Sequence, residues 1–340
     1  MINIVLLTLL VVIAIAIIRM KDLFAAVMLA GIYGLLSASF FVAMDAVDVA
    51  FTEAAVGAGI STLLMLVVIT MTGRKEKPTR HKPRSALFVV IITGGLLIYG
   101  TLDMPYFGSA DAPIHNHTAP HYINDSMEEI GVPNIVTSVL ASYRAFDTFG
   151  EVVVIFTAGI GVLAMLSVGR RKEDDDEEIA SINDSMHLQH LVIRIVAKML
   201  IPFILLFALY VQFHGDFGPG GGFQAGVIFA AAIILYTMLF GLSTARKVIN
   251  QTFIQLIAAI GVLLYGSVGI VSLMNGGNFF DYNVLSSDPI AGQHLGILLI
   301  EWGVGCTVAS VMVIIFFNFA GRRELLQHSK KSQNQESTIC

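Results

Sequence analysis

The stretch IAGQHLGILLIEWGVGCTVASVMVIIFFN, residues 290–318, decides the fold. It is longer than the roughly 20 apolar residues that cross a lipid bilayer as a helix. Its charged residue, Glu301, lies near the middle of the run, and His294 lies seven residues earlier, two helical turns along the same face. The stretch therefore predicts a membrane-spanning helix that carries a carboxylate at mid-membrane depth.

The rest of the chain has the same character. It has 340 residues, of which 56% are hydrophobic and 13% charged, with a mean hydropathy of +0.78. Ordinary soluble chains are about 25% charged, so lipid is the natural solvent for this chain. We predict an all-α, polytopic membrane protein. The expected spans are 2–18, 23–44, 48–72, 85–101, 148–168, 195–213, 222–242, 251–274 and 290–318.

Charges in the connectors give an independent count of the spans. Basic and non-basic connectors alternate along the chain without a break: 73–84 is rich in Lys and Arg, whereas 102–133 has neither. The positive-inside rule then predicts nine spans, an N-terminus outside and a C-terminus in the cytoplasm. Residues 133–147 are ambiguous. Pro133 opens either a helix continuous with the fifth span or a short interfacial helix, and Arg144 is expected to pair with Asp147 and Glu151.

A run of acidic residues, EDDDEE at 173–178, divides the chain, because it is too charged to pack in a core. We expect five parts. They are a three-helix module at 1–84, a two-helix module at 85–172, a charged cytoplasmic linker at 173–190, a four-helix domain at 191–325 and a polar tail at 326–340. Residues 2–18 lack a basic stretch before them and a cleavage site after them, so we interpret them as a retained span.

Ionisable residues inside spans are costly in hydrocarbon and mark candidate sites. Glu301 and His294 suit a proton relay, although Glu301 paired with a Lys or Arg of a neighbouring helix fits equally well. Glu53 follows Asp48 and Thr52 in DVAFTEAAVGAG and suits an ion path. Asp147 and Glu151 share a helical face and offer either hard oxygen ligands for a cation or two stations of a proton path. Alternatively, both lie in the outer interface, solvated or held by Arg144.

Two further positions are weaker candidates. Lys198 lies near the inner end of its span, where snorkelling to the headgroups is favoured over a role as a proton station. His214 opens the segment HGDFGPGGGFQAG, residues 214–226, where it titrates at the outer mouth or simply caps the loop. Four glycines and Pro219 within five residues of this segment preclude helix there. We predict a structural loop whose backbone amides open the next span and accept a carboxylate. It comprises Gly215, Pro219, Gly220, Gly221 and Gly222.

Several functions are excluded or disfavoured. Two cysteines, Cys306 and Cys340, are too few for an iron–sulfur site, so any redox centre belongs to another chain. The sequence holds no nucleophile–base pair, nucleotide motif or nucleic-acid patch. The histidines of HNHTAPH, His115, His117 and His121, are a weak metal signal. We predict no enzyme activity of its own, no cofactor and no bound metal.

Three groups of segments resemble a known family. DLFAAVMLAGIYGLLSASFF (22–41) with DVAFTEAAVGAG (48–59) resembles the three-helix module at the C-terminus of the large Mrp antiporter subunit. This module is a separate small subunit in membrane-bound hydrogenases. YRAFDTFGEVVVIFTAGIGVLAML (143–166) resembles the short module that follows it. YVQFHGDFGPGGGFQAGVIFAA (210–231) with HLGILLIEWGVGCTVA (294–309) resembles the MrpB subunit.

The resemblance implies a subunit of a multi-subunit Na⁺/H⁺ antiporter in a prokaryotic cell membrane, working beside other membrane subunits. It also places Glu53, Asp147, Glu151, His214, His294 and Glu301 at the family's polar intramembrane positions. Two alternatives stay open. One is the membrane arm of a redox-driven ion pump of the membrane-bound hydrogenase type. The other is a purely structural role in assembly. The sequence does not decide which ion is moved.

Overall fold

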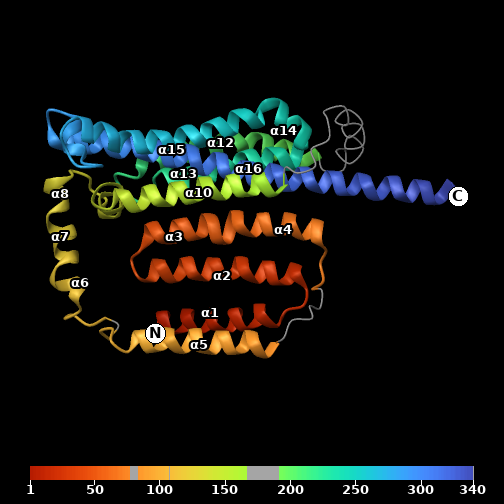
Figure 1. The fold of residues 1–340 in the computed structure, drawn as a ribbon, viewed down its shortest axis with the longest axis horizontal. Coiled ribbons are helices and arrows are strands. Elements are labelled where there is room, and N and C mark those ends of the chain that lie inside the picture. The colour runs from red at the N-terminus through yellow and green to blue at the C-terminus, as the bar shows by residue number, and fades with distance from the viewer. Residues whose placement is uncertain (77–82, 107, 167–190, 340) are drawn as a thin grey trace.

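The computed structural model describes residues 1–76, 83–106, 108–166 and 191–339. The predicted charged linker at 173–190 lies outside these ranges. The described chain is helical, apart from turns and one isolated bridge between Asp22 and Lys75. Figure 1 shows the long helices lying side by side, with their axes roughly parallel.

Nine helices of the described residues are long and apolar enough to cross a membrane, which confirms the predicted count. They are α1 (Ile2–Arg19), α2 (Leu23–Ala43), the continuous α3–η1–α4 (Val47–Glu53, Ala54–Ile60 and Ser61–Thr72), α5 (Pro83–Thr101), α10 (Ala145–Leu166), α12 (Leu191–His214), α13 (Gly222–Phe240), α15 (Gln251–Met274) and α16 (Pro289–Ile339). The helix α16 continues through most of the stretch predicted as a polar tail.

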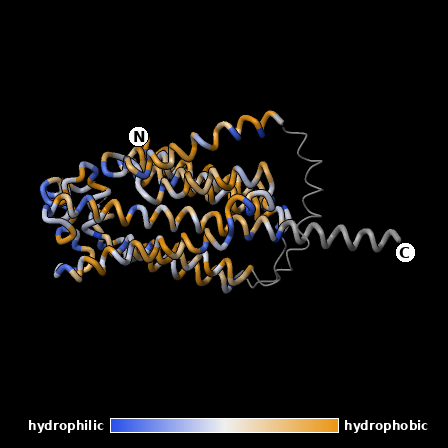
Figure 2. Tube along the Cα trace, turned by 90° about the horizontal axis from the view of Figure 1, so that it is seen from above, coloured by the Kyte–Doolittle hydropathy of each residue, from blue (hydrophilic) through white to orange (hydrophobic). Residues whose placement is uncertain are grey.

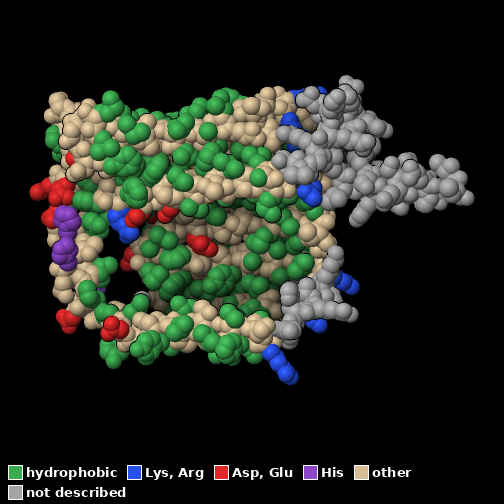
Figure 3. Space-filling view, viewed as in Figure 1, with side chains coloured by type: hydrophobic (Ala, Val, Ile, Leu, Met, Phe, Trp, Pro, Cys, Tyr) green, Lys and Arg blue, Asp and Glu red, His purple; other side chains and the backbone are tan. Residues whose placement is uncertain are grey.

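The hydropathy of the residues varies along the long axis of the bundle. In Figure 2 hydrophobic residues occupy the middle of the helices and hydrophilic ones gather near their ends. On the face seen in Figure 3, Lys and Arg lie mostly at one end of the bundle, and His with many of the acidic side chains at the other. This asymmetry is the spatial counterpart of the alternating connectors. It distinguishes the two ends of the bundle without assigning either to the cytoplasm.

The N-terminal helices are joined by contacts in their connectors. Asp22 is the N-cap of α2, and its carboxylate accepts hydrogen bonds from the amides of Phe24 and Ala25 at 3.0 and 3.2 Å. The same carboxylate forms an ion pair with Arg74 at 2.8 Å, just beyond α4. Desolvation is the largest single influence and opposes ionisation, but the amides of Ala25 and Phe24 and the Arg74 guanidinium together outweigh it and lower the pKa of Asp22.

The packed core lies in the second half of the chain, where α16 contacts α10, α13 and α15. Small residues bring these backbones together. A methyl group on Gly303 would lie 2.7 Å from the carbonyl oxygen of Gly261, and one on Gly226 would lie 2.8 Å from that of Gly305. Close approach of this kind is how helices associate in lipid, where apolar burial gives no driving force. Tyr265, Ile297 and Phe317 are fully buried in this core.

A connector of short helices, α6 (Pro113–Asn116), α7 (Thr118–Asn124) and α8 (Ser126–Glu129), runs from α5 along one end of the bundle to the region of α10. The ambiguous stretch that follows forms α9 (Ile135–Thr137) and a π-helix, η2 (Ser138–Tyr143). Arg144, with φ −121° and ψ 32°, separates these turns from α10. Of the two alternatives for 133–147, a short helix before the fifth span is therefore the one observed.

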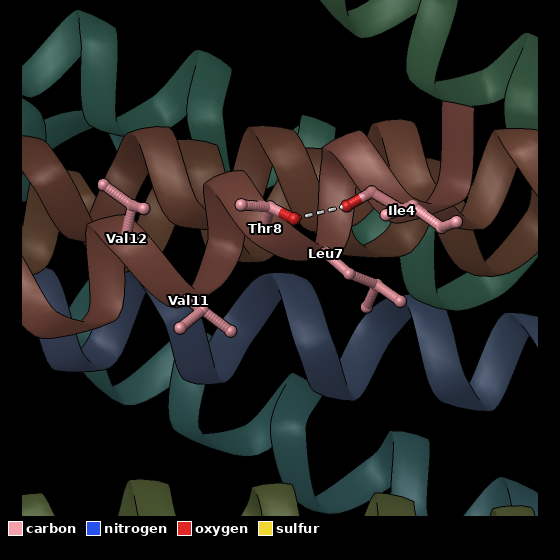
Figure 4. A pocket seen from close by; sticks show the side chains of 5 residues that line it. All are labelled: Ile4, Leu7, Thr8, Val11 and Val12. Atoms are coloured by element: carbon pink, nitrogen blue, oxygen red, sulfur yellow. Dashed lines mark hydrogen bonds between the residues drawn. The ribbon is translucent and has the colours of Figure 1, made fainter. Parts of the chain in front are cut away.

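A shallow hollow on α1 is lined almost entirely by apolar side chains. It is lined by Ile4, Leu7, Thr8, Val11 and Val12. Figure 4 shows these side chains and the one polar group among them, the Thr8 hydroxyl, which donates to the carbonyl oxygen of Ile4 at 2.7 Å. No ionisable residue lines the hollow, so it is a surface suited to lipid chains.

Candidate functional site

The connector between α12 and α13 folds as a tight loop at one end of the bundle. Gly221 has φ +109°, which favours glycine, and its amide donates to the carbonyl oxygen of Val211 at 3.0 Å. A methyl group on Gly220 would lie 2.6 Å from that same oxygen, and one on Gly222 would collide with the carbonyl of Glu301. The glycines are thus needed because the loop packs directly on the backbones of α12 and α16.

The carboxylate of Glu301 lies against this loop. Its Oε1 is 3.1 Å and 3.0 Å from where side chains on Gly215 and Gly221 would begin. It also interacts electrostatically with Asp216 in the middle of the loop. Within the described part of the chain, Glu301 forms no hydrogen bond and no ion pair with Lys or Arg. The ion-pair alternative for Glu301 therefore has no partner among these residues.

His294 does not stand alone with Glu301. Its Nδ1 lies 3.5 Å from Oδ2 of Asp216, and both side chains are partly exposed. Asp216 thus interacts with His294 on one side and Glu301 on the other. The sequence interpretation did not select Asp216. Its place inside the glycine-rich segment, directly after His214 and Gly215, was the available signal.

His214 is turned toward a neighbouring ring. Its imidazole stacks on Tyr210 at 4.9 Å with an interplanar angle of 18°. A side chain on Gly218 would lie 3.0 Å from the imidazole Nε2. The imidazole therefore packs between α12 and the loop, an arrangement that suits its predicted alternative as a loop cap.

Residues from two other segments hold the loop in place. Asn134 donates through Nδ2 to the carbonyl oxygens of Gly215 and Gly218 at 3.1 and 3.0 Å. The Thr137 hydroxyl donates to Gly215 at 2.6 Å, and the Gly220 amide donates to Asp48 at 3.3 Å. The predicted reception of a carboxylate by a loop amide is thus seen with Asp48. Sequence reasoning selected none of these three polar side chains.

Glu53 ends α3, where the helix changes to the π-helix η1. Its Oε1 lies 3.3 Å from where a side chain on Gly34 would begin, so the carboxylate faces α2. The preceding residue, Thr52, faces α13 instead and accepts a hydrogen bond from Gln224 at 2.9 Å. Among the described residues, no hydrogen bond or ion pair joins Glu53 to Glu301, so the two carboxylates lie in separate surroundings.

Asp147 and Glu151 differ in their surroundings. Asp147 pairs with Arg144 at 2.6 Å, and both side chains are more than half exposed. Glu151 is exposed on α10 and has no ion pair with the described residues. The hydroxyl of Tyr265, which donates to the Ala145 carbonyl at 2.8 Å, interacts electrostatically with both Glu151 and Glu301. Tyr265 is therefore a buried polar group between the second and fourth predicted parts of the chain.

The remaining candidates lie apart. Lys198 is exposed, with its Nζ 5.3 Å from the ring of Phe240, and Arg194 lies 4.9 Å from the same ring. His121 pairs with Asp125 at 2.8 Å. In the described ranges no group of three His, Cys, Asp or Glu side chains is arranged to hold a metal ion. These residues do not join the cluster around Glu301.

Nine described helices that are long and apolar enough to cross a membrane define the class of multi-pass membrane proteins. Three protein-family profiles match the chain. Residues 192–314 match a domain related to the MnhB subunit of Na⁺/H⁺ antiporters, whereas 8–74 and 85–183 match MbhD and MbhE, two subunits of MBH. The chain belongs to the MnhB family of antiporter subunits and carries MbhD and MbhE modules in addition.

Individual relatives of this chain are also antiporter subunits by name. A putative antiporter subunit mnhB2 of Staphylococcus aureus is 33% identical over 135 residues, which cover 39% of this chain and 95% of that protein. A probable K⁺/H⁺ antiporter A/B protein of Rhizobium meliloti is 23% identical over 93% of this chain. The chain spans about a third of that relative, 34% of its length.

Two solved structures share the fold. A chain of the Mrp complex from Dietzia sp. DQ12-45-1b superposes with a TM-score of 0.73 and 24% identity, over 93% of this chain and 34% of that one. A chain of the membrane-bound sulfane sulfur reductase, an archaeal respiratory membrane complex, gives a TM-score of 0.50 and 27% identity, over 70% of this chain and 98% of that one.

Proposed function

We propose that this chain is a membrane subunit of a multi-subunit cation/proton antiporter of the Mrp type, and that it contributes carboxylates to the path of the proton or cation. Family membership and the multi-pass fold support the setting. The single observation that carries the ion-path role is Glu301, a carboxylate inside a span with no cationic partner in the described chain. Such a group is stable only when it is protonated, ion-bound or paired with a group from another chain.

The same physical argument extends to partners. Glu53 and Glu151 also lie in spans without an ion pair among the described residues, and lipid cannot satisfy them. We therefore propose that the chain functions inside a complex of several membrane subunits in a prokaryotic cell membrane. Its parts would correspond to the predicted boundaries at 84, 172, 190 and 325. Native purification through a tag should then recover several other hydrophobic chains.

The topology we propose has the N-terminus outside and the C-terminus inside, because of the alternation of basic connectors. Cysteines introduced at Lys75 and Lys247 should resist a membrane-impermeant thiol reagent in intact cells, and one at Asp111 should react. All three side chains are exposed. The reverse labelling pattern would mean that the topology is inverted. Different labelling at Lys75 and Lys247 would mean that the number of spans between them differs from the proposed one.

A second candidate function is the membrane arm of a redox-driven ion pump. The specific support is the match to nearly the whole of a chain in the sulfane sulfur reductase complex, together with the two MBH modules. The co-purified chains distinguish the two functions. Antiporter subunits support the first, and subunits with iron–sulfur or other redox centres support the second.

The decisive experiment uses Glu301→Gln and Glu53→Gln in the assembled complex. Gln keeps the size and hydrogen bonding of the side chain but does not titrate. We expect either substitution to abolish the pH-gradient response to added cation in membrane vesicles while the complex still assembles. Sodium and potassium are compared, because relatives carry names with either ion. Near-normal exchange per assembled complex in both variants would leave only the structural role.

A further inference from the structure

Asn134 occupies a special place in the chain. It follows Pro133 and forms the N-cap of α9, with its Oδ1 accepting from the amide of Val136 at 3.0 Å. Its backbone amide donates to the carbonyl oxygen of Asp216 at 3.0 Å. One residue before a three-residue helix thus reaches a loop that lies more than 80 positions later in the sequence.

The side-chain amide of Asn134 has a fixed orientation. Its Nδ2 faces three oxygens: the carbonyls of Gly215 and Gly218, at 3.1 and 3.0 Å, and Oδ1 of Asp48 at 3.4 Å. Its Oδ1 faces an amide hydrogen. Rotating the carboxamide by 180° would oppose oxygen to oxygen on one side and donor to donor on the other. The hydrogen-bond pattern therefore requires an amide at this position, with its nitrogen toward the loop.

Two further bonds complete the arrangement. Thr137, buried one turn along from Asn134, donates to the Gly215 carbonyl at 2.6 Å. Asp48 accepts from the Gly220 amide at 3.3 Å through the same oxygen that Asn134 contacts. Non-helical backbone at the membrane boundary must find such partners, because the loop's carbonyls have no helical hydrogen bonds.

The contacts join all three parts of the chain that match separate family profiles. Asp48 lies within 8–74, Asn134 within 85–183 and the loop within 192–314. Glu301 lies on the other side of the same loop, against Gly215 and Gly221. A shift of α3 that moves Asp48 would act on Asn134 and Gly220, and through them on the backbone that surrounds the Glu301 carboxylate.

We propose that Asn134 is a positioning residue: its carboxamide fixes the loop 215–221 beside Glu301 and couples α3, through Asp48, to that site. Asn134 does not bind the transported ion. The inference about transport rests on the proposed function, whereas the inference about the loop does not. The experiment therefore has one measurement for each.

The first measurement reports the loop itself. In the full complex, deuterium labelling of the hydrogen-bonded loop amides, those of Gly220 and Gly221, is followed by mass spectrometry and the rate is recorded. Asn134→Ala should raise the rate roughly 5–10-fold, the factor expected when about one net hydrogen bond is lost. Asn116→Ala is the matched control, because within the described ranges the side chain of Asn116 donates to its own connector, to the carbonyl oxygen of Asp111 at 3.4 Å. It should leave the rate unchanged.

The second measurement reports transport. Asn134→Ala should raise the cation concentration for half-maximal exchange and shift the pH profile, with a smaller change in maximal rate per complex. Asp48→Asn keeps an oxygen for the Gly220 amide and should lie between the wild type and Asn134→Ala. Thr137→Val, which removes one bond and keeps the side-chain shape, serves where Asn134→Ala does not assemble.

Unchanged labelling in both Asn134→Ala and Thr137→Val would overturn the proposal, whatever the transport result. Faster labelling with unchanged half-saturation and pH profile would overturn the positioning role and leave a structural bond. Faster labelling in a complex whose wild type shows no exchange supports the loop's fixation and contradicts the proposed function instead.

Discussion

In the 18-residue apolar windows of α13, α15 and α16, 44%, 33% and 56% of the residues are buried inside the chain, whereas none is buried in the window of α5. In water such a contrast would mark α5 as unstable. In lipid it does not, because an exposed Leu or Phe is already in an apolar solvent. Tight backbone packing holds the second half. In the first half α2 packs closely on η1, since a methyl group on Gly34 would lie 2.8 Å from the carbonyl carbon of Gly57, whereas one on Gly94 in α5 would meet nothing within 4 Å. Burial therefore measures protein packing here, and not the stability of a helix.

The largest expected difference between the halves comes from a pair of phenylalanines. Phe317 in α16 is fully buried, and Phe88 in α5 is 65% exposed. Phe317→Ala leaves a cavity and should cost about 3–5 kcal/mol, whereas Phe88→Ala should cost well under about 1 kcal/mol. Both losses of stability are measured by thermal unfolding in detergent, with size-exclusion chromatography used to monitor the folded protein that remains. Equal losses of stability would contradict the contrast.

Glycines give a second matched pair with a smaller effect. A methyl group on Gly222 meets the Glu301 carbonyl, and one on Gly94 in α5 meets nothing within 4 Å. Gly222→Ala should destabilise by about 1–3 kcal/mol through overpacking. Gly94→Ala should be neutral or slightly stabilising, because Ala favours helix by about 1 kcal/mol over Gly. The same unfolding assay applies, and a destabilising Gly94→Ala would show that α5 packs on another chain at that position.

The smallest effect tests the connectors of the first half. The pKa of Asp22 lies below its ordinary value, so its ion pair and amide contacts stabilise the fold above the unfolded pKa of about 3.9. That contribution is lost as the pH falls through the lower folded pKa. Asp22→Asn should lower the melting temperature slightly at pH 7, and this loss should shrink as the pH falls through the folded pKa of Asp22. Asp103→Asn, in another connector, is the control, and a loss that persists at low pH would rule out the charge as its cause.

Long hydrophobic runs made the helices predictable. Nine spans follow from the runs and from the basic connectors, since both patterns are local in sequence. The surroundings of the glycine loop could be predicted only in part. The loop's composition indicated a turn whose amides receive a carboxylate. It did not indicate that Asp48 would supply that carboxylate, or that Glu301 would lie against the loop.

The polar residues around the loop were not predictable, for a physical reason. Asn134 and Thr137 bond to partners 78–84 positions away, and Asp48 to one 172 positions away. Their own segments contain nothing unusual: an Asn after Pro, and a Thr in a helical turn. Periodicity and composition describe a residue's neighbours along one helix, whereas these contacts are made across three segments.

The meeting of three segments at Asn134 also bears on synthesis. In S. aureus the MnhB region is a protein of its own, since 135 residues cover 95% of it, and its encounter with any partner is bimolecular. Here the corresponding region is translated on the same chain as Asp48 and Asn134. A tether of moderate length gives an effective concentration in the millimolar range. One messenger therefore delivers the three parts in equal numbers, and their encounter does not depend on the expression level in the cell.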